Sequence, residues 1–154
     1  FQPATMRKIL LGEEVTIHAD ATCTVPGSRF YIHARNSSAA LLNLLTTVRS
    51  TSRLAERYNI VGEKEIDNLQ LAQKIADVIG LPLRYSLVSF HAQRPGHDLR
   101  YALSSEKLYG TGYRHPVGFD ESLERTIQWT LGHPWWINMT HEQVAAATSR
   151  TRNG

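Results

Sequence analysis

Hydrophobic residues along the 154-residue chain recur at helical spacing in some segments and at strand spacing in others. Apolar positions three and four apart predict amphipathic helices over residues 3–11, 40–45 and 69–79. Leu123, Ile127 and Leu131, each four apart, predict another helix, which Asp120 would open. Four further runs alternate or are rich in β-branched and aromatic residues, which predicts extended segments at 13–20, 29–34, 57–62 and 83–90. Helices and strands interleave, so we expect an α/β or α+β fold, helix-rich with a few short strands.

Capping residues sharpen the ends of these elements. Gly12 and Gly80 follow the first and third helical patterns and are expected to end them, and Asp67 is expected to cap the third. Three polar residues are candidates to cap the second helix: Asn36, Ser37 and Ser38. Residues 48–56 are expected to form a polar linker. A short helix is expected at 104–108, and an Ala-rich helix and a fraying basic tail near the C-terminus.

Composition narrows the classes of partner. Hydrophobic residues make up 42% of the chain, and no apolar run reaches the roughly 20 residues that span a bilayer. The net charge is +3, but the basic residues are scattered, without the basic stripe and interleaved aromatics typical of a nucleic-acid binder. We therefore do not favour nucleic acid or membrane as partners, and the surplus charge suits a small phosphate-bearing ligand.

Cysteine and histidine usage points to a cytoplasmic protein without a metal. Cys23 is the only cysteine, so no internal disulfide can form, and a reducing compartment is the default. The seven histidines include no helical i, i+4 pair of the kind that binds zinc, because His91 and His97, like His133 and His141, are spaced otherwise. We expect no metal site.

The most charged bend is the run RPGHDLRY, residues 94–101. Arg94 and Arg100 could each offer a planar fork of donors to phosphate oxygens. Asp98 could equally pair with Arg100 in an ordinary solvated loop, and composition alone leaves both interpretations open. Arg29 leads an extended segment, and Asn59 lies within another, where a buried amide would need partners.

Taken in order, these segments resemble a known family. The anchors are MRKILLGEEVTIHAD, RFYIHARN, RYNIVGEKEIDNLQLAQKIADVIG, RPGHDLRYALSSEKL and GFDESLERTIQW. They are similar to the C-terminal portion of extended short-chain dehydrogenases/reductases in the nucleotide-sugar 4,6-dehydratase and epimerase group, above all its dTDP-glucose 4,6-dehydratase branch. The resemblance covers residues 1–138 and leaves 139–154 as a C-terminal extension.

The resemblance implies a substrate-binding portion that lies beside an NAD(P)-binding Rossmann domain. It implies that Arg29 and Arg94 hold the nucleotide pyrophosphate and that Asn59 helps to fix the nucleotide. It also implies that the same pocket is lined by Pro95, Gly96, His97 and Asp98, and that the strand with Thr16, Ile17 and His18 meets the base or its ribose. The chain departs from the family pattern where acidic residues are usual, at Phe30, Ala34, Arg35 and Asn36.

This chain alone is not expected to catalyse the family's reaction. It has no glycine-rich dinucleotide turn, and none of its six tyrosines is followed four positions later by lysine. Because it begins with Phe1 and not Met, we expect it to be part of a longer protein. The leading hypothesis is nucleotide-diphosphate binding within an NAD(P)-dependent dehydratase or epimerase, with the N-terminal cofactor-binding half and a nucleotide sugar as partners. The alternative is a non-catalytic binding or structural protein that retains this lobe. Whether it forms a homodimer stays open.

Overall fold

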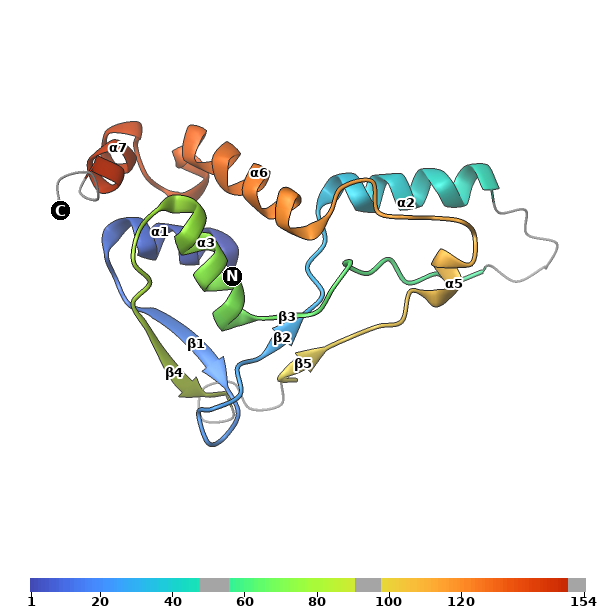
Figure 1. Ribbon diagram of the computed structural model, residues 1–154, viewed down its shortest axis with the longest axis horizontal. Helices are drawn as coiled ribbons and strands as arrows, with labels where there is room; N and C mark the ends of the chain where they lie inside the picture. Colours follow the sequence, from blue (N-terminus) through green and yellow to red (C-terminus); the bar gives the residue numbers. More distant parts are fainter. Residues whose placement is uncertain (48–55, 91–97, 150–154) are drawn as a thin grey trace.

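The computed structural model describes residues 1–47, 56–90 and 98–149, and it is a mixed α/β fold, rich in helix with short strands (Figure 1). In chain order the elements are α1 (Gln2–Leu11), β1 (Val15–Ala19), β2 (Ser28–Arg29), α2 (Ala34–Thr47), β3 (Ile66–Asp67), α3 (Asn68–Ile79), β4 (Tyr85–Ser89), β5 (Arg100–Tyr101), α5 (Glu106–Tyr109), α6 (Phe119–Gly132), the 3₁₀ helix η1 (Pro134–Ile137) and α7 (His141–Ser149).

The larger part of the core lies between α1, α3, α6 and the two-stranded sheet of β1 and β4. These two strands are parallel, with Val15 opposite Tyr85 and Ala19 opposite Ser89. Alternate residues of β1 are buried, as the period-two pattern predicts, and α3 contacts both α1 and α6. The side chains with the least exposure in this cluster are Met6, Ile17, Ala72, Ile75, Ala76 and Ile127.

The caps of α1 and α3 are confirmed. Gly12 and Gly80 both adopt the left-handed conformation, with φ of 71° and 79°, and end their helices. Asp67 begins α3, because its carboxylate accepts a hydrogen bond from the backbone N–H of Gln70 at 2.8 Å. Local signals of this kind work because a cap satisfies backbone groups that the helix itself leaves unpaired.

A second, smaller sheet joins three distant segments. The central strand β2 runs antiparallel to β3 and parallel to β5, so that Ser28 lies opposite both Asp67 and Arg100. Gly27 precedes this strand and touches the backbone of Leu99, where a Cβ atom would come within 2.8 Å of the Leu99 carbonyl oxygen. The sheet therefore brings the end of the 94–101 run next to Arg29.

Helix α2 extends away from the main core and lies on a smaller cluster near α5 (Figure 1). That cluster is built on Ala40, Leu108 and Tyr113. The Asn36 side chain fastens the start of α2 to the distant Val117 backbone: its amide donates to the carbonyl at 2.8 Å and accepts from the N–H at 3.3 Å.

Several expected boundaries are wrong. Residues 57–62 form no strand, and β2 ends at Arg29, so residues 30–33 continue outside the sheet. Helix α2 starts at Ala34, which places Asn36, Ser37 and Ser38 inside it instead of at its cap. Helix α6 starts one residue before Asp120, and its first N–H donates to the carboxylate of Glu63 at 2.6 Å.

Two further expectations were a polar linker at residues 48–56 and the absence of an apolar run long enough to span a bilayer. Most of the expected polar linker, residues 48–55, lies outside the described residues. Among the helices that the structure describes, none combines the length and the apolar character needed to cross a membrane.

Candidate functional site

Arg29 is held in place by the strand that follows the RPGHD run. Its Nη1 atom donates to the carbonyl oxygens of Ser28 and Leu99 at 2.5 and 2.6 Å, and Nη2 donates to that of Asp98 at 3.2 Å. The guanidinium carbon also lies 4.1 Å from the centre of the Tyr101 ring. Parallel pairing of β2 with β5 produces these contacts, so the guanidinium has one well-defined position.

Arg29 lies between two hollows. One, of about 280 Å³, is lined with it by segments 60–61 and 101–103 and by Phe30. The other, of about 170 Å³, is lined by residues from the chain start, β1, β2 and the neighbouring segments: Phe1, His18, Gly27, Tyr31, Asn68, Phe90 and Leu99. No acidic side chain lines either hollow among residues 1–47, 56–90 and 98–149. Arg29 therefore contributes a positive charge to both.

The neighbouring Arg100 is engaged elsewhere. Its Nε and Nη2 atoms donate to the two carboxylate oxygens of Glu65 at 2.7 and 2.8 Å, and the Ser28 hydroxyl donates to the same carboxylate at 2.5 Å. Hydrogen bonds from Arg100 and then Ser28 lower the pKa of Glu65 to about 2. Arg100 therefore pairs with Glu65, and not with Asp98 as one interpretation expected. This ion pair joins β5 to the residue before β3.

The expected strand residues divide between surface and core. Thr16 lies on the exposed face of β1, and His18 lines the smaller hollow and meets the Phe90 ring edge-on, with centroids 5.7 Å apart. Ile17 is a correction, because its side chain is fully buried in the main core and has no surface to offer a nucleotide.

Asn59 is exposed, contrary to the expectation of a buried amide. Its Nδ2 donates to the carbonyl oxygen of Ser104 at 3.0 Å. The next residue, Ile60, lines the larger hollow with Arg29, so Asn59 stands beside that hollow and not on its wall.

The remaining expected ligands belong to the charged run. Arg94, Pro95, Gly96 and His97 lie outside the described residues. Asp98 is exposed and contributes its backbone carbonyl to Arg29. The structure therefore brings Arg29, His18 and Asp98 to one region, with Asn59 at its edge.

Two residues of this region were not expected from the sequence. The ring of Tyr101 makes a cation–π contact with the Arg29 guanidinium. Tyr31 lines the smaller hollow, and its hydroxyl donates to the Asn68 side chain at 2.6 Å. Burial raises the pKa of Tyr31, and the charge of Arg29 acts in the opposite direction. No local pattern marks Tyr101, because its partner lies far away in the sequence. Within the described ranges, no cluster of three metal-ligating side chains occurs.

Comparison with known proteins gives a partial match. No family model matches the chain. Over 136 residues, 87% of this chain, it is 30% identical to a dTDP-glucose 4,6-dehydratase of Actinoplanes sp., and over 144 residues it is 27% identical to that of Xanthomonas campestris pv. campestris. The chain spans only 39% and 38% of the lengths of these relatives.

Solved structures agree on the fold. The dTDP-glucose 4,6-dehydratase of Bacillus anthracis, in complex with NAD, superposes with a TM-score of 0.67 at 24% identity, over 86% of this chain and 39% of that one. A UDP-N-acetylglucosamine 4-epimerase from Methanobrevibacter ruminantium gives a TM-score of 0.67 at 20% identity, over 86% of this chain and 39% of the epimerase. The sequence anchors, the mixed α/β fold and these matches agree, and the chain matches a portion of the extended short-chain dehydrogenases/reductases of the nucleotide-sugar dehydratase and epimerase group.

Proposed function

We propose that this chain forms the nucleotide-diphosphate-binding wall of an NAD(P)-dependent nucleotide-sugar 4,6-dehydratase or epimerase. The observation that carries the proposal is the position of Arg29, between two hollows that no described acidic side chain lines. A diphosphate carries about two negative charges, and a guanidinium is the side chain best suited to its oxygens.

The contacts of Arg29 prepare it for an anion without exhausting it. A guanidinium has five N–H donors, and the described bonds involve Nη1 and Nη2. Its Nε–H has no described partner and is available for a phosphate oxygen. Packing on the Tyr101 ring holds the guanidinium plane, so less conformational entropy is lost when the ligand binds.

The role of this chain is to bind and orient the substrate. Its sequence contains no glycine-rich dinucleotide turn and no Tyr-x-x-x-Lys pair, so no residue here is assigned to the cofactor or to proton transfer. NAD(P) bound to the cofactor-binding half would supply hydride acceptance from the sugar, and a diphosphate anchored at Arg29 would position the sugar for that chemistry.

The alternative function is a binding or structural protein without catalysis. The departures from the family pattern at Phe30, Ala34 and Arg35 favour it, because acidic side chains are usual there. The full open reading frame distinguishes the two functions. A cofactor-binding half with its glycine turns upstream of Phe1 supports the enzyme, and a reading frame without one supports the alternative.

Calorimetric titration of the full-length protein with dTDP, UDP and GDP tests the Arg29 site. For Arg29→Ala we expect at least roughly tenfold weaker binding of the preferred diphosphate, since a charge-assisted fork is lost. The matched control is Arg114→Ala. Arg114 also donates to two backbone carbonyls and lies over a tyrosine ring, 6.0 Å from its centroid, yet lines neither hollow.

The nucleoside separates a binding role from a structural one. Loss of Arg29 also frees the carbonyls of Asp98 and Leu99, so Arg29→Ala is compared with Arg29→Lys, which keeps the charge and loses the fork. If Arg29 binds the diphosphate, both variants should lower the affinity for dTDP much more than the affinity for thymidine. Two results would show that Arg29 only supports the fold. One is an equal loss of affinity for dTDP and for thymidine in the Arg29 variants. The other is a dTDP affinity of Arg29→Ala equal to that of the control Arg114→Ala.

A further inference from the structure

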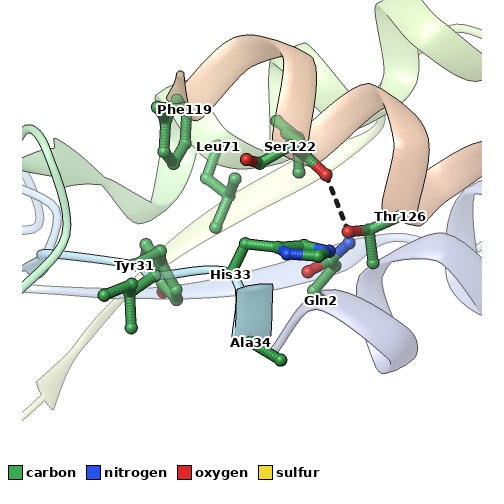
Figure 2. A pocket seen from close by; sticks show the side chains of 10 residues that line it. Gln2, Tyr31, His33, Ala34, Leu71, Phe119, Ser122 and Thr126 are labelled. Atoms are coloured by element: carbon green, nitrogen blue, oxygen red, sulfur yellow. Dashed lines mark hydrogen bonds between the residues drawn. The ribbon is translucent and has the colours of Figure 1, made fainter. Parts of the chain in front are cut away.

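A separate pair of adjoining hollows lies where the starts of α1 and α2 meet α6, and Figure 2 shows the first of them. Their volumes are about 280 and 350 Å³, and His33, Ser122 and Thr126 line both. Figure 2 shows His33 and Gln2 facing α6, from which Ser122 and Thr126 project. The proposed diphosphate site does not use these residues. Of the described residues, only Tyr31 lines both this pair and the smaller hollow beside Arg29.

Two buried polar groups on this wall have no hydrogen-bond partner among the residues that the structure describes. Ser122 is 6% exposed, and its hydroxyl oxygen makes no hydrogen bond with any described residue. The amide nitrogen of Gln2 is likewise buried and unpaired within the described parts of the chain. Buried donors normally find acceptors, so two such groups on one hollow indicate that an occupant supplies the acceptor.

His33 adds a third donor. Its Nδ1 atom accepts the backbone N–H of Arg35 at 3.0 Å, which makes His33 the cap of α2. In a neutral imidazole one nitrogen accepts and the other carries the proton, so the Arg35 bond places the proton on Nε2. The hollow therefore offers an N–H, a hydroxyl and an amide to the same occupant.

The surroundings of these donors are apolar on one side and cationic on the other. Leu71, Phe119 and Leu123 line the first hollow, and Arg35 and Arg125 line the second. No acidic side chain lines either one within the described ranges. Arg125 forms an ion pair with Glu121, with 2.5 Å between Nη2 and Oε1. Arg35, by contrast, makes no ion pair with any described residue.

We propose that this hollow binds a small organic carboxylate. The carboxylate accepts hydrogen bonds from His33 Nε2, Ser122 Oγ and Gln2 Nε2, and Arg35 balances its charge. The apolar part of the ligand packs on Phe119 and Leu71. A carboxylate fits because it only accepts hydrogen bonds, while the polar groups on this wall can donate them. The resemblance predicts acidic residues at 34–36, and Arg35 reverses that charge in this chain.

Calorimetry of the full-length protein with 3-phenylpropionate tests the proposal, with 3-phenylpropionamide as its neutral counterpart and inorganic phosphate as an anion without an apolar part. We expect the carboxylate to bind at least about tenfold more tightly than the amide, because only the anion makes charge-assisted hydrogen bonds. Equal affinity of carboxylate and amide would overturn the proposal, and so would phosphate binding as tightly as the carboxylate.

Three variants locate the site. His33→Asn keeps an acceptor for the Arg35 N–H, as Nδ1 does, and removes the distal donor. Arg35→Gln and Ser122→Ala remove the charge and the hydroxyl. Each substitution should lower the affinity for 3-phenylpropionate roughly fivefold or more. The control is Arg84→Gln: Arg84 lines a separate hollow of about 300 Å³ and donates to the Gly12 carbonyl. The affinity of Arg84→Gln for 3-phenylpropionate should stay within about twofold of that of the parent protein.

Thermal denaturation and dTDP binding complete the test. A His33→Asn or Arg35→Gln protein that melts like the parent and binds 3-phenylpropionate unchanged overturns the proposal. Ser122→Ala that melts at a higher temperature with unchanged carboxylate binding shows an unfilled packing defect instead, and also overturns it. Unchanged dTDP affinity in His33→Asn keeps this result independent of the Arg29 site.

Discussion

Glu65 links two strands of the small sheet by accepting hydrogen bonds from Ser28 and Arg100, and its stabilising effect should vanish in acid. Its pKa is lowered to about 2 by hydrogen bonds from Arg100 and Ser28, against 4.5 for the free side chain. A lowered pKa in the folded state means that the stabilisation is complete above the unfolded pKa and is lost as the pH falls through the folded one.

Glu65→Gln tests this residue. The variant should melt at a lower temperature than the parent at pH 7, and the difference should shrink as the pH is lowered from about 5 to 2. Thermal unfolding followed by circular dichroism across that range measures it. The control is Glu124→Gln, on the exposed side of α6, which should follow the parent throughout. A difference for Glu65→Gln that is independent of pH would contradict the prediction.

Arg29 shows what a sequence can say at the level of one residue. Its resemblance to a family motif marked it as a phosphate ligand, but nothing local showed that it would bond the Leu99 carbonyl, 70 positions away. The same limit applies to Tyr101. Asn59 was misjudged because its segment has the composition of a strand but pairs with none, which leaves the side chain exposed.

At the level of elements, helix ends were predictable wherever the cap is local. The end of α1 and both ends of α3 depend on residues within one turn, and their caps were predicted correctly. The starts of α2 and α6 depend on tertiary partners. Asn36 had the right chemistry for a cap but holds the Val117 backbone instead, and α6 receives its first acceptor from Glu63.

The cap of α3 gives a prediction at this level. Asp67→Ala removes the acceptor of the Gln70 N–H and should lower the free energy of unfolding by about 1 kcal/mol. Asp77→Ala, near the other end of the same helix, is the control. A carboxylate there is unfavourable to the helix dipole, so its removal should change stability little. Urea denaturation of both variants measures the difference, and equal losses would contradict a capping role.

At the level of the whole molecule, α2 presents an unusual surface. Leu41, Leu42 and Leu45 are 54%, 63% and 83% exposed, while the opposite side of the helix carries the buried Ala40. The sequence pattern showed that these leucines share a helix, but it could not show which side would face the core. That choice is made by Leu108 and Tyr113, which lie far along the chain.

The polypeptide of residues 1–154 should associate through these leucines. Exposed apolar patches drive self-association, so sedimentation velocity should show species larger than a monomer that increase with concentration. The double variant Leu42→Glu and Leu45→Lys should shift the distribution toward monomer. Gln70→Glu with Gln73→Lys makes the same charge changes on exposed positions of α3 and should leave the distribution unaltered. A parent that is already monomeric at high concentration would contradict this prediction.

The bond between Asn36 and Val117 also sets an order of events during synthesis. The two residues are 81 positions apart, so at ordinary translation rates Asn36 is added to the chain roughly 4 to 16 seconds before Val117. Until Val117 is made, the start of α2 lacks this anchor, and before Leu108 and Tyr113 pack on it the side of the helix with Ala40 is open to a chaperone. Nascent chains halted just before Val117 would therefore be its best substrates.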